Sequence, residues 1–85
     1  MNEIIIQALE QEKAIQGTKY KATLAHKLDV GSSTFAKYLN GFVVSETMGI
    51  KIHIGCAILL EKPETKKVSQ SMRVEWYLKN KKKNK

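Results

Sequence analysis

The chain has 85 residues, 42% of them hydrophobic, with one cysteine and a formal net charge of +7 at pH 7. This length supports one small domain with a modest core, and a single cysteine excludes an intramolecular disulfide, which fits a reducing cytosolic location. No apolar run approaches the roughly 20 residues that span a bilayer. The first residues lack a basic segment and turn acidic, so they do not predict a signal peptide.

The positive charge is concentrated at one end of the chain. Residues 1–61 contain six lysines and six acidic residues, whereas residues 62–85 contain eight lysines and Arg73 against two glutamates. A folded body with a basic end indicates a polyanionic partner, although a lysine-rich terminus can also serve solubility alone. Residues 80–85, NKKKNK, carry no apolar side chain, so we expect a disordered basic tail after a single domain over residues 1–79.

A helix is predicted over residues 2–16. Asn2 is a good N-cap, and Gly17 is a natural stop. Ile5 and Leu9 lie one turn apart, so they share the face that should be buried. The charged residues of the other face are expected to point into water: Glu10, Glu12 and Lys13.

Residues 21–41, KATLAHKLDVGSSTFAKYLNG, are predicted to form two short helices around a tight turn. Residues 21–28 and residues 32–40 each place apolar side chains at helical spacing. The three residues 29–31 between them are too few for anything but a turn, and Gly41 can end the second helix without a Cβ penalty. Two helices this close bury their apolar faces only by crossing steeply, which is the helix-turn-helix arrangement.

The next segment fits two patterns. Apolar residues at 48, 50, 52 and 54 alternate with glycine or polar residues, as in a strand. However, Ile50, Ile54 and Ile58 also follow one face of a helix. Two glycines, Gly49 and Gly55, weaken either element. The residues alone leave both a helix and a strand open.

The stretch after Pro63 is also ambiguous. Apolar and polar residues alternate over 72–78, which favours a strand, whereas Val68, Met72 and Trp76 form the stripe of a helix. Trp76 is too large to remain exposed without a reason. We therefore predict that it covers either the small core or a two-fold partner.

Residues 24–41 carry a resemblance to a known family. The pattern LAxxLxVxxSTF, followed by YLNG, resembles the helix-turn-helix of phage Cro and lambda-repressor-like regulators. Ala25 is small where the two helices cross. Tyr20 stands where a capping Thr often precedes the first helix of the family. Two further positions depart from the family pattern: Asp29 replaces the usual turn glycine, and Gly31 replaces a capping Ser or Thr. Both are tolerable, because Asp enters the left-handed region readily and Gly is an acceptable N-cap.

The resemblance implies a mainly α fold: a small lambda-repressor-like helix-turn-helix bundle, possibly with a C-terminal strand or hairpin. The helix-turn-helix unit would occupy residues 21–41, with the first helix packed across its back. The family comparison favours a helix over residues 46–61.

The resemblance also implies a set of DNA contacts. In the family, the start of the second helix and one residue a turn later face the major groove. Lys37 would read guanine O6 and N7, with a solvated surface lysine as the alternative. The implied base contacts are Gly31, Ser32, Ser33 and Lys37. The implied contacts to the DNA backbone are Lys21 and Asn40. Lys19 and Lys27 are neighbouring candidates for the same contacts.

The resemblance and the charge pattern together predict a sequence-specific double-stranded DNA-binding regulator. The small size and the resemblance imply that it is a repressor of a phage, plasmid or other mobile element, in the cytosol of a prokaryotic or infected cell. It would bind a palindromic operator as a homodimer with Trp76 in the dimer interface. We expect no catalysis, metal, cofactor, membrane or small-molecule substrate, because ligand and nucleophile motifs are absent. The alternatives are a helix-turn-helix module that inhibits a partner protein and a nonspecific nucleic-acid binder.

Overall fold

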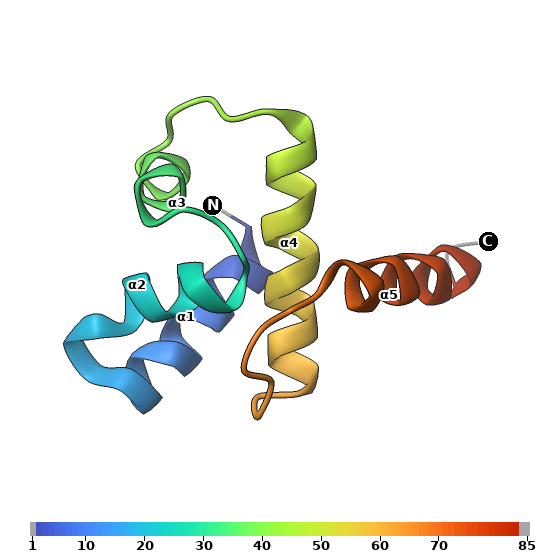
Figure 1. The fold of residues 1–85 in the computed structure, drawn as a ribbon, viewed down its shortest axis with the longest axis horizontal. Coiled ribbons are helices and arrows are strands. Elements are labelled where there is room, and N and C mark those ends of the chain that lie inside the picture. Colours follow the sequence, from blue (N-terminus) through green and yellow to red (C-terminus); the bar gives the residue numbers. More distant parts are fainter. Residues whose placement is uncertain (1, 84–85) are drawn as a thin grey trace.

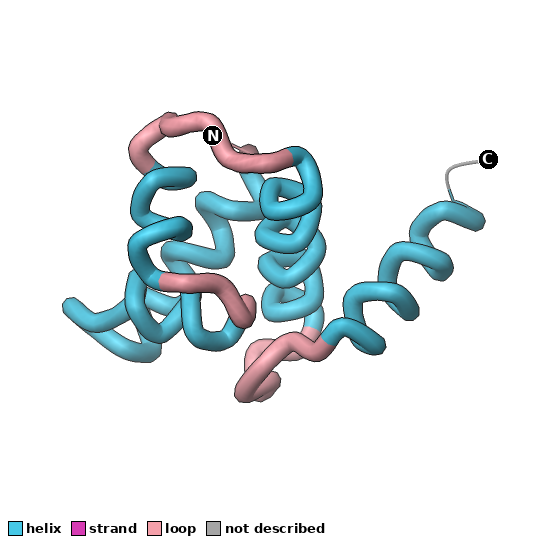
Figure 2. The backbone as a smooth tube through the Cα atoms, turned by 45° about the horizontal axis from the view of Figure 1, so that its top comes forward, coloured by secondary structure: helices cyan, strands magenta, loops and turns pink. Residues whose placement is uncertain are grey.

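The computed structural model describes residues 2–83 and is mainly helical, with no strand among those residues (Figure 1). Helix α4 stands at the centre, α1, α2 and α3 lie on one side of it, and α5 extends away on the other side. The tube in Figure 2 shows the two longer loops, one joining α3 to α4 and one joining α4 to α5. In chain order, the elements are α1 (Glu3–Gln16), η1 (Gly17–Lys19), α2 (Tyr20–Lys27), α3 (Ser32–Leu39), α4 (Glu46–Glu61) and α5 (Gln70–Lys83).

Local capping sets the bounds of α1 and α4. The Asn2 side chain accepts a hydrogen bond of 2.8 Å from the amide of Ile4, and Gly17 ends α1 at a φ of 67°. In the same way, Ser45 Oγ accepts a bond of 3.1 Å from the amide of Met48. These bonds satisfy amide groups that have no partner within the helix. The predicted helices over residues 2–16 and 46–61 are therefore confirmed.

The core lies where α1, α2, α3 and α4 meet. Ala25 of α2 and Phe35 of α3 are both buried and belong to the same core cluster. A Cβ built on Gly55 would lie 2.5 Å from a methyl group of Leu28, the residue that follows α2, so the Leu28 side chain packs on the α4 backbone at a position that only glycine fits without a shift. The other large buried side chains are Ile5, Leu24, Ile52, Leu59 and Val68.

The strand that alternation favoured over residues 72–78 is not formed, because this segment belongs to α5. Ser69 Oγ accepts a bond of 3.2 Å from the amide of Met72 and caps the helix. Met72 and Trp76, one turn apart, pack against the core, and a strand would have no neighbour for its hydrogen bonds among the described residues.

The expected disordered tail differs from the structure in its first part. Helix α5 continues to Lys83, and the amide of the Asn80 side chain donates a bond of 2.9 Å to the carbonyl of Trp76. Residues 80–83 are therefore helical, whereas residues 84–85 lie outside the described residues.

The loop between α4 and α5 returns to the helix-turn-helix. The amide of Val68, a fully buried residue, donates a bond of 2.7 Å to the carbonyl of Lys27 at the end of α2. Beside it, Lys67 Nζ lies 3.3 Å from the carboxylate of Asp29. Arg73 of α5 donates a bond of 3.1 Å to the Val68 carbonyl. This loop therefore connects the base of α5 to the turn between α2 and α3.

Candidate nucleic-acid interface

The turn between α2 and α3 has the backbone conformation that the sequence predicts. Asp29 has a φ of 61°, the one left-handed residue other than glycine in the described chain. The amide of Val30 donates a bond of 3.0 Å to the carbonyl of Ala25, which closes the turn. Gly31 has extended angles and begins α3 as its N-cap without a side-chain bond. Asp29 thus adopts the left-handed conformation expected of it, and Gly31 occupies the expected N-cap position.

The turn is held in place by lysines from other elements. Lys51 of α4 donates a bond of 2.6 Å to the backbone carbonyl of Asp29, and its Nζ lies 3.9 Å from the carboxylate. The hydrogen bond from Lys67, followed by the positive charges of Lys67 and Lys51, lowers the pKa of Asp29. These contacts fix the start of α3 relative to α4.

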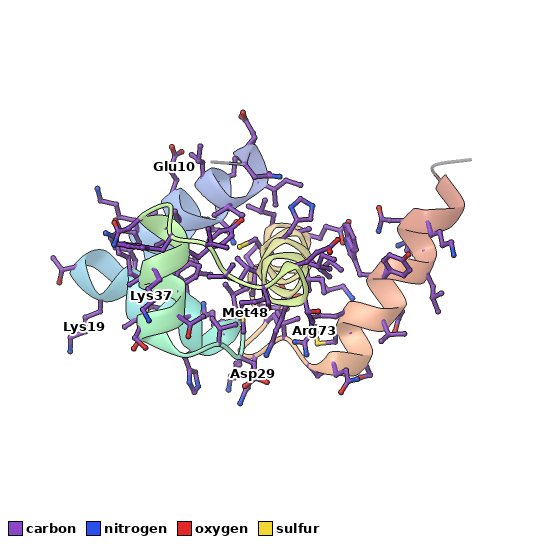
Figure 3. All side chains as sticks on the ribbon, turned by 90° about the horizontal axis from the view of Figure 1, so that it is seen from above. Glu10, Lys19, Asp29, Lys37, Met48 and Arg73 are labelled. Atoms are coloured by element: carbon purple, nitrogen blue, oxygen red, sulfur yellow. The ribbon has the colours of Figure 1, made fainter. Side chains whose placement is uncertain are left out.

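The predicted base-contacting residues lie together on the solvent-exposed face of α3. Ser33, Ala36, Lys37 and Asn40 are exposed and follow helical spacing along this face, whereas Phe35 is buried against the core. Figure 3 shows Lys37 on the outer side of the helix. We call the exposed residues of α3 and its N-cap the recognition face: Gly31, Ser32, Ser33, Ala36, Lys37 and Asn40.

The recognition face combines small side chains with one long one. Glycine, serine and alanine leave the helix backbone close to the surface, while Lys37 extends beyond it. Sequence reasoning missed Ala36, because an alanine carries no polar signal. Its exposed position between Ser33 and Lys37 becomes evident only once the buried face of α3 is known.

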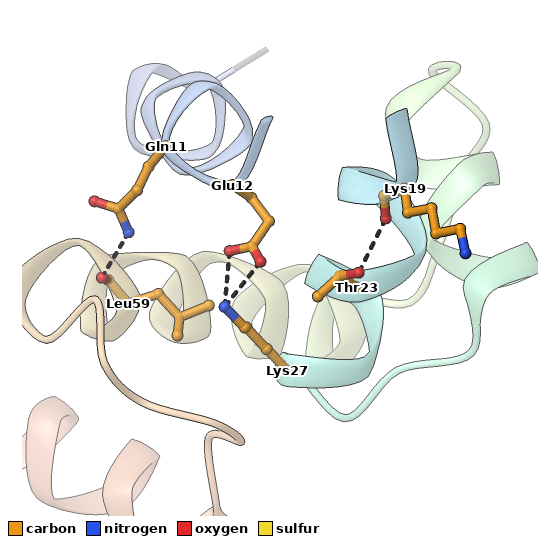
Figure 4. A network of polar contacts seen from close by, with 6 residues as sticks. All are labelled: Gln11, Glu12, Lys19, Thr23, Lys27 and Leu59. Carbon is orange, nitrogen blue, oxygen red and sulfur yellow. Dashed lines mark hydrogen bonds and ion pairs between the residues drawn. The ribbon is translucent and has the colours of Figure 1, made fainter. Parts of the chain in front are cut away.

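A cluster of lysines surrounds the start of α2. The Nζ atoms of Lys13 and Lys21 lie 5.8 Å and 5.9 Å from the centre of the Tyr20 ring, a geometry in which an aromatic ring attracts cations. Lys19 is exposed next to them, and its carbonyl accepts a bond of 3.0 Å from Thr23 (Figure 4). Figure 3 shows Lys19 and Lys37 at the same end of the molecule. Lys13, which was expected only to face water, therefore joins Lys19 and Lys21.

Lys27 does not belong to this exposed surface. Its Nζ lies 2.8 Å and 3.1 Å from the two carboxylate oxygens of Glu12 (Figure 4). The Glu12 side chain is only 2% exposed and that of Lys27 only 13%. The expectation that Glu12 faces water is wrong, because a partner on α2 compensates its charge inside the protein. Gln11, its neighbour, donates a bond of 3.0 Å to the carbonyl of Leu59.

Trp76 belongs to α5, which lies on the other side of α4 from α3 (Figure 1). It is half-buried and packs against the core, with its ring 6.4 Å from that of His53 in an edge-to-face arrangement. Of the two roles predicted for it, covering the core is the one present within a single chain. Arg73, also on α5, marks this side in Figure 3, across α4 from Lys37.

The one cysteine of the chain is buried. Burial raises the pKa of the Cys56 thiol to about 12, so the thiolate is scarce at neutral pH. Among residues 2–83, no group of three or more His, Cys, Asp or Glu side chains could hold a metal ion. No described helix is both long and apolar enough to cross a membrane.

Comparison with known proteins gives no match to a family model, a curated protein or a solved structure.

Proposed function

We propose that this chain is a non-enzymatic, sequence-specific double-stranded DNA-binding protein that inserts α3 into the major groove. The observation that carries the proposal is the recognition face, a fixed helix surface of small side chains around Lys37. A major groove about 12 Å wide admits an α-helix, and small side chains let the helix approach the base edges closely.

Each residue of the recognition face then has a chemical role. Lys37 donates hydrogen bonds, which guanine O6 and N7 accept. The hydroxyls of Ser32 and Ser33 donate or accept, so they specify a base weakly. The methyl group of Ala36 matches the methyl group of thymine. Asn40, exposed at the end of α3, can donate to a phosphate.

The lysine cluster supplies the sequence-independent part of the affinity. Lys13, Lys19 and Lys21 are positioned to neutralise phosphates beside the groove that α3 enters, and each neutralised phosphate contributes about 0.9 to the slope of log K against log salt. Lys27 is left out of this set, because its ammonium is bound to Glu12. Because residues 24–41 resemble Cro-like regulators, we extend this proposal to repression of transcription in a mobile element.

The experiment is a selection of random genomic DNA fragments by the purified chain, followed by sequencing. One enriched palindrome would support a dimeric regulator. Recovery of all sequences would favour a nonspecific nucleic-acid binder, and recovery of none would favour a protein-binding module.

Variants then test the assignment of the residues. Lys37→Ala should reduce binding to the selected site by about 5- to 150-fold, the equivalent of 1–3 kcal/mol of base discrimination, with a smaller effect on random DNA. Lys19→Ala and Lys21→Ala should weaken both DNAs by similar factors and lower the salt slope. Lys62→Ala, an exposed lysine outside the proposed interface, is the control. Equal losses on both DNAs for Lys37→Ala would contradict its role on base edges.

A further inference from the structure

Helix α5 has apolar side chains on two faces, and only one of them is covered. Met72 and Trp76 pack against the core. On the other side, Val74, Tyr77 and Leu78 are 50%, 49% and 54% exposed. This second face has the i, i+3, i+4 spacing of a helix that docks in a groove.

A cleft next to α5 is also apolar. It has a volume of about 760 Å³ and lies between the loop from α3 to α4, α4 itself and α5. Phe42 and Val43 at its rim are 64% and 98% exposed, and Ile50 on α4 is 49% exposed. Large apolar residues gathered at one place on a small protein mark an interaction site.

The charges around the cleft and along α5 are complementary. Among the residues whose side chains the structure describes, no lysine or arginine lines the cleft, and Glu46 does line it. The uncovered face of α5 continues to Lys81, one turn beyond Tyr77 and Leu78, whose Nζ lies 5.9 Å from the centre of the Tyr77 ring. The described lining of the cleft thus suits a basic amphipathic helix better than a nucleic acid.

We propose that the cleft binds α5 of a second copy of this chain, so that two chains form a two-fold dimer by exchanging α5 contacts. Tyr77 lines the cleft of its own chain and also belongs to the uncovered face of α5. The two surfaces are therefore adjacent, as a two-fold interface between identical patches requires. In this dimer, Val74 and Leu78 of each chain are covered by Phe42 and Val43 of the other.

The required area is compatible with the size of the chain. A standard interface buries about 800 Å² per partner, roughly one seventh of the 5847 Å² of accessible surface of the chain. The cleft and the uncovered side of α5 extend over the loop from α3 to α4, α4 and α5. None of the residues Ser33, Ala36 and Lys37 lines the cleft, so the recognition face stays open in the dimer.

The inference does not depend on DNA binding, and its test contains no DNA. The oligomeric state is measured by sedimentation equilibrium for the wild type and for three variants. Leu78→Glu changes the face of α5, and Val43→Lys changes the rim of the cleft. Ile15→Glu is the matched control, because Ile15 is 55% exposed on α1 and does not line the cleft.

The wild type and Ile15→Glu should dimerise equally, whereas Leu78→Glu and Val43→Lys should each raise the dissociation constant at least about a hundredfold, because each places an unpaired charge in an apolar contact. Mixing the Leu78→Glu chain with the Val43→Lys chain should restore dimers, since one contact then joins opposite charges and the other is native. Circular dichroism verifies that all variants are folded.

Three results would overturn the proposal. The first is a wild type that stays monomeric at millimolar concentration. The second is dimerisation that both variants leave unchanged. The third is failure of the mixed chains to dimerise, which would indicate that α5 contacts α5 of the second copy rather than its cleft.

Discussion

Replacing Lys27 tests whether its ammonium stabilises the fold or contacts DNA. In the structure it compensates a Glu12 carboxylate that is only 2% exposed, and the Lys27 Nζ lies 2.8 Å and 3.1 Å from the two carboxylate oxygens. Lys27→Met keeps the length of the side chain but leaves that carboxylate buried without a partner. Removal of one member of a buried ion pair costs about 3–5 kcal/mol.

The lower figure is the appropriate one, because the Lys27 side chain is 13% exposed and water can reach the site. About 3 kcal/mol corresponds to a fall of roughly 12–24 °C in melting temperature for a domain of this size. Lys19→Met, at an exposed lysine, should change the free energy of unfolding by no more than about 0.5 kcal/mol. Thermal melting and urea unfolding measure both variants.

A second substitution should restore the lost stability. Glu12→Leu combined with Lys27→Met removes both charges, and replacement of a buried ion pair by apolar residues of similar volume is often neutral or stabilising. The double variant should therefore recover most of the stability lost by Lys27→Met. The reasoning is refuted if Lys27→Met melts like the wild type, and a lower salt slope for DNA in that variant would then return Lys27 to the phosphate contacts.

Three further predictions concern other positions. Gly49→Ala should stabilise α4 by up to about 1 kcal/mol, because its Cβ would meet nothing within 4 Å, whereas Gly55→Ala should destabilise the protein by about 1–3 kcal/mol through overpacking; urea unfolding compares the two. Cys56, with a thiol pKa of about 12, should resist a thiol reagent at pH 8 until the protein is unfolded, and rapid labelling of the native protein would contradict its burial. The lowered pKa of Asp29 means that its stabilising contribution is present above its ordinary value of 3.8 and is lost as the pH falls through the lower folded value; the wild type should therefore lose more stability in acid than Asp29→Asn.

The features predicted best from the sequence are those that depend on residues close to one another in the chain. The ends of α1 and α4 depend on caps that lie within three residues of the groups they satisfy, such as Asn2 and Ser45. The pair of short helices was also predictable, because both segments have helical spacing and only three residues separate them, and Ala25 and Phe35 are indeed buried.

The errors arose where the decisive partner is distant in sequence or absent. Glu12 has the spacing of a solvent-exposed residue, and no residue close to it in sequence predicts its ion pair with Lys27. The alternation over residues 72–78 fitted a strand, but a strand also needs a neighbouring strand, and periodicity does not report whether one exists. Lys13 joined the lysine cluster only through Tyr20, which brings two helices together.

The bond between the Val68 amide and the Lys27 carbonyl also has a consequence for the order of folding. The two helices of the helix-turn-helix are adjacent in sequence, so they can meet early and at a low cost in loop-closure entropy. Their junction is completed, however, only by a residue that follows α4. During synthesis, a nascent chain that ends before Val68 can contain both helices and still lack the contact that closes the end of α2.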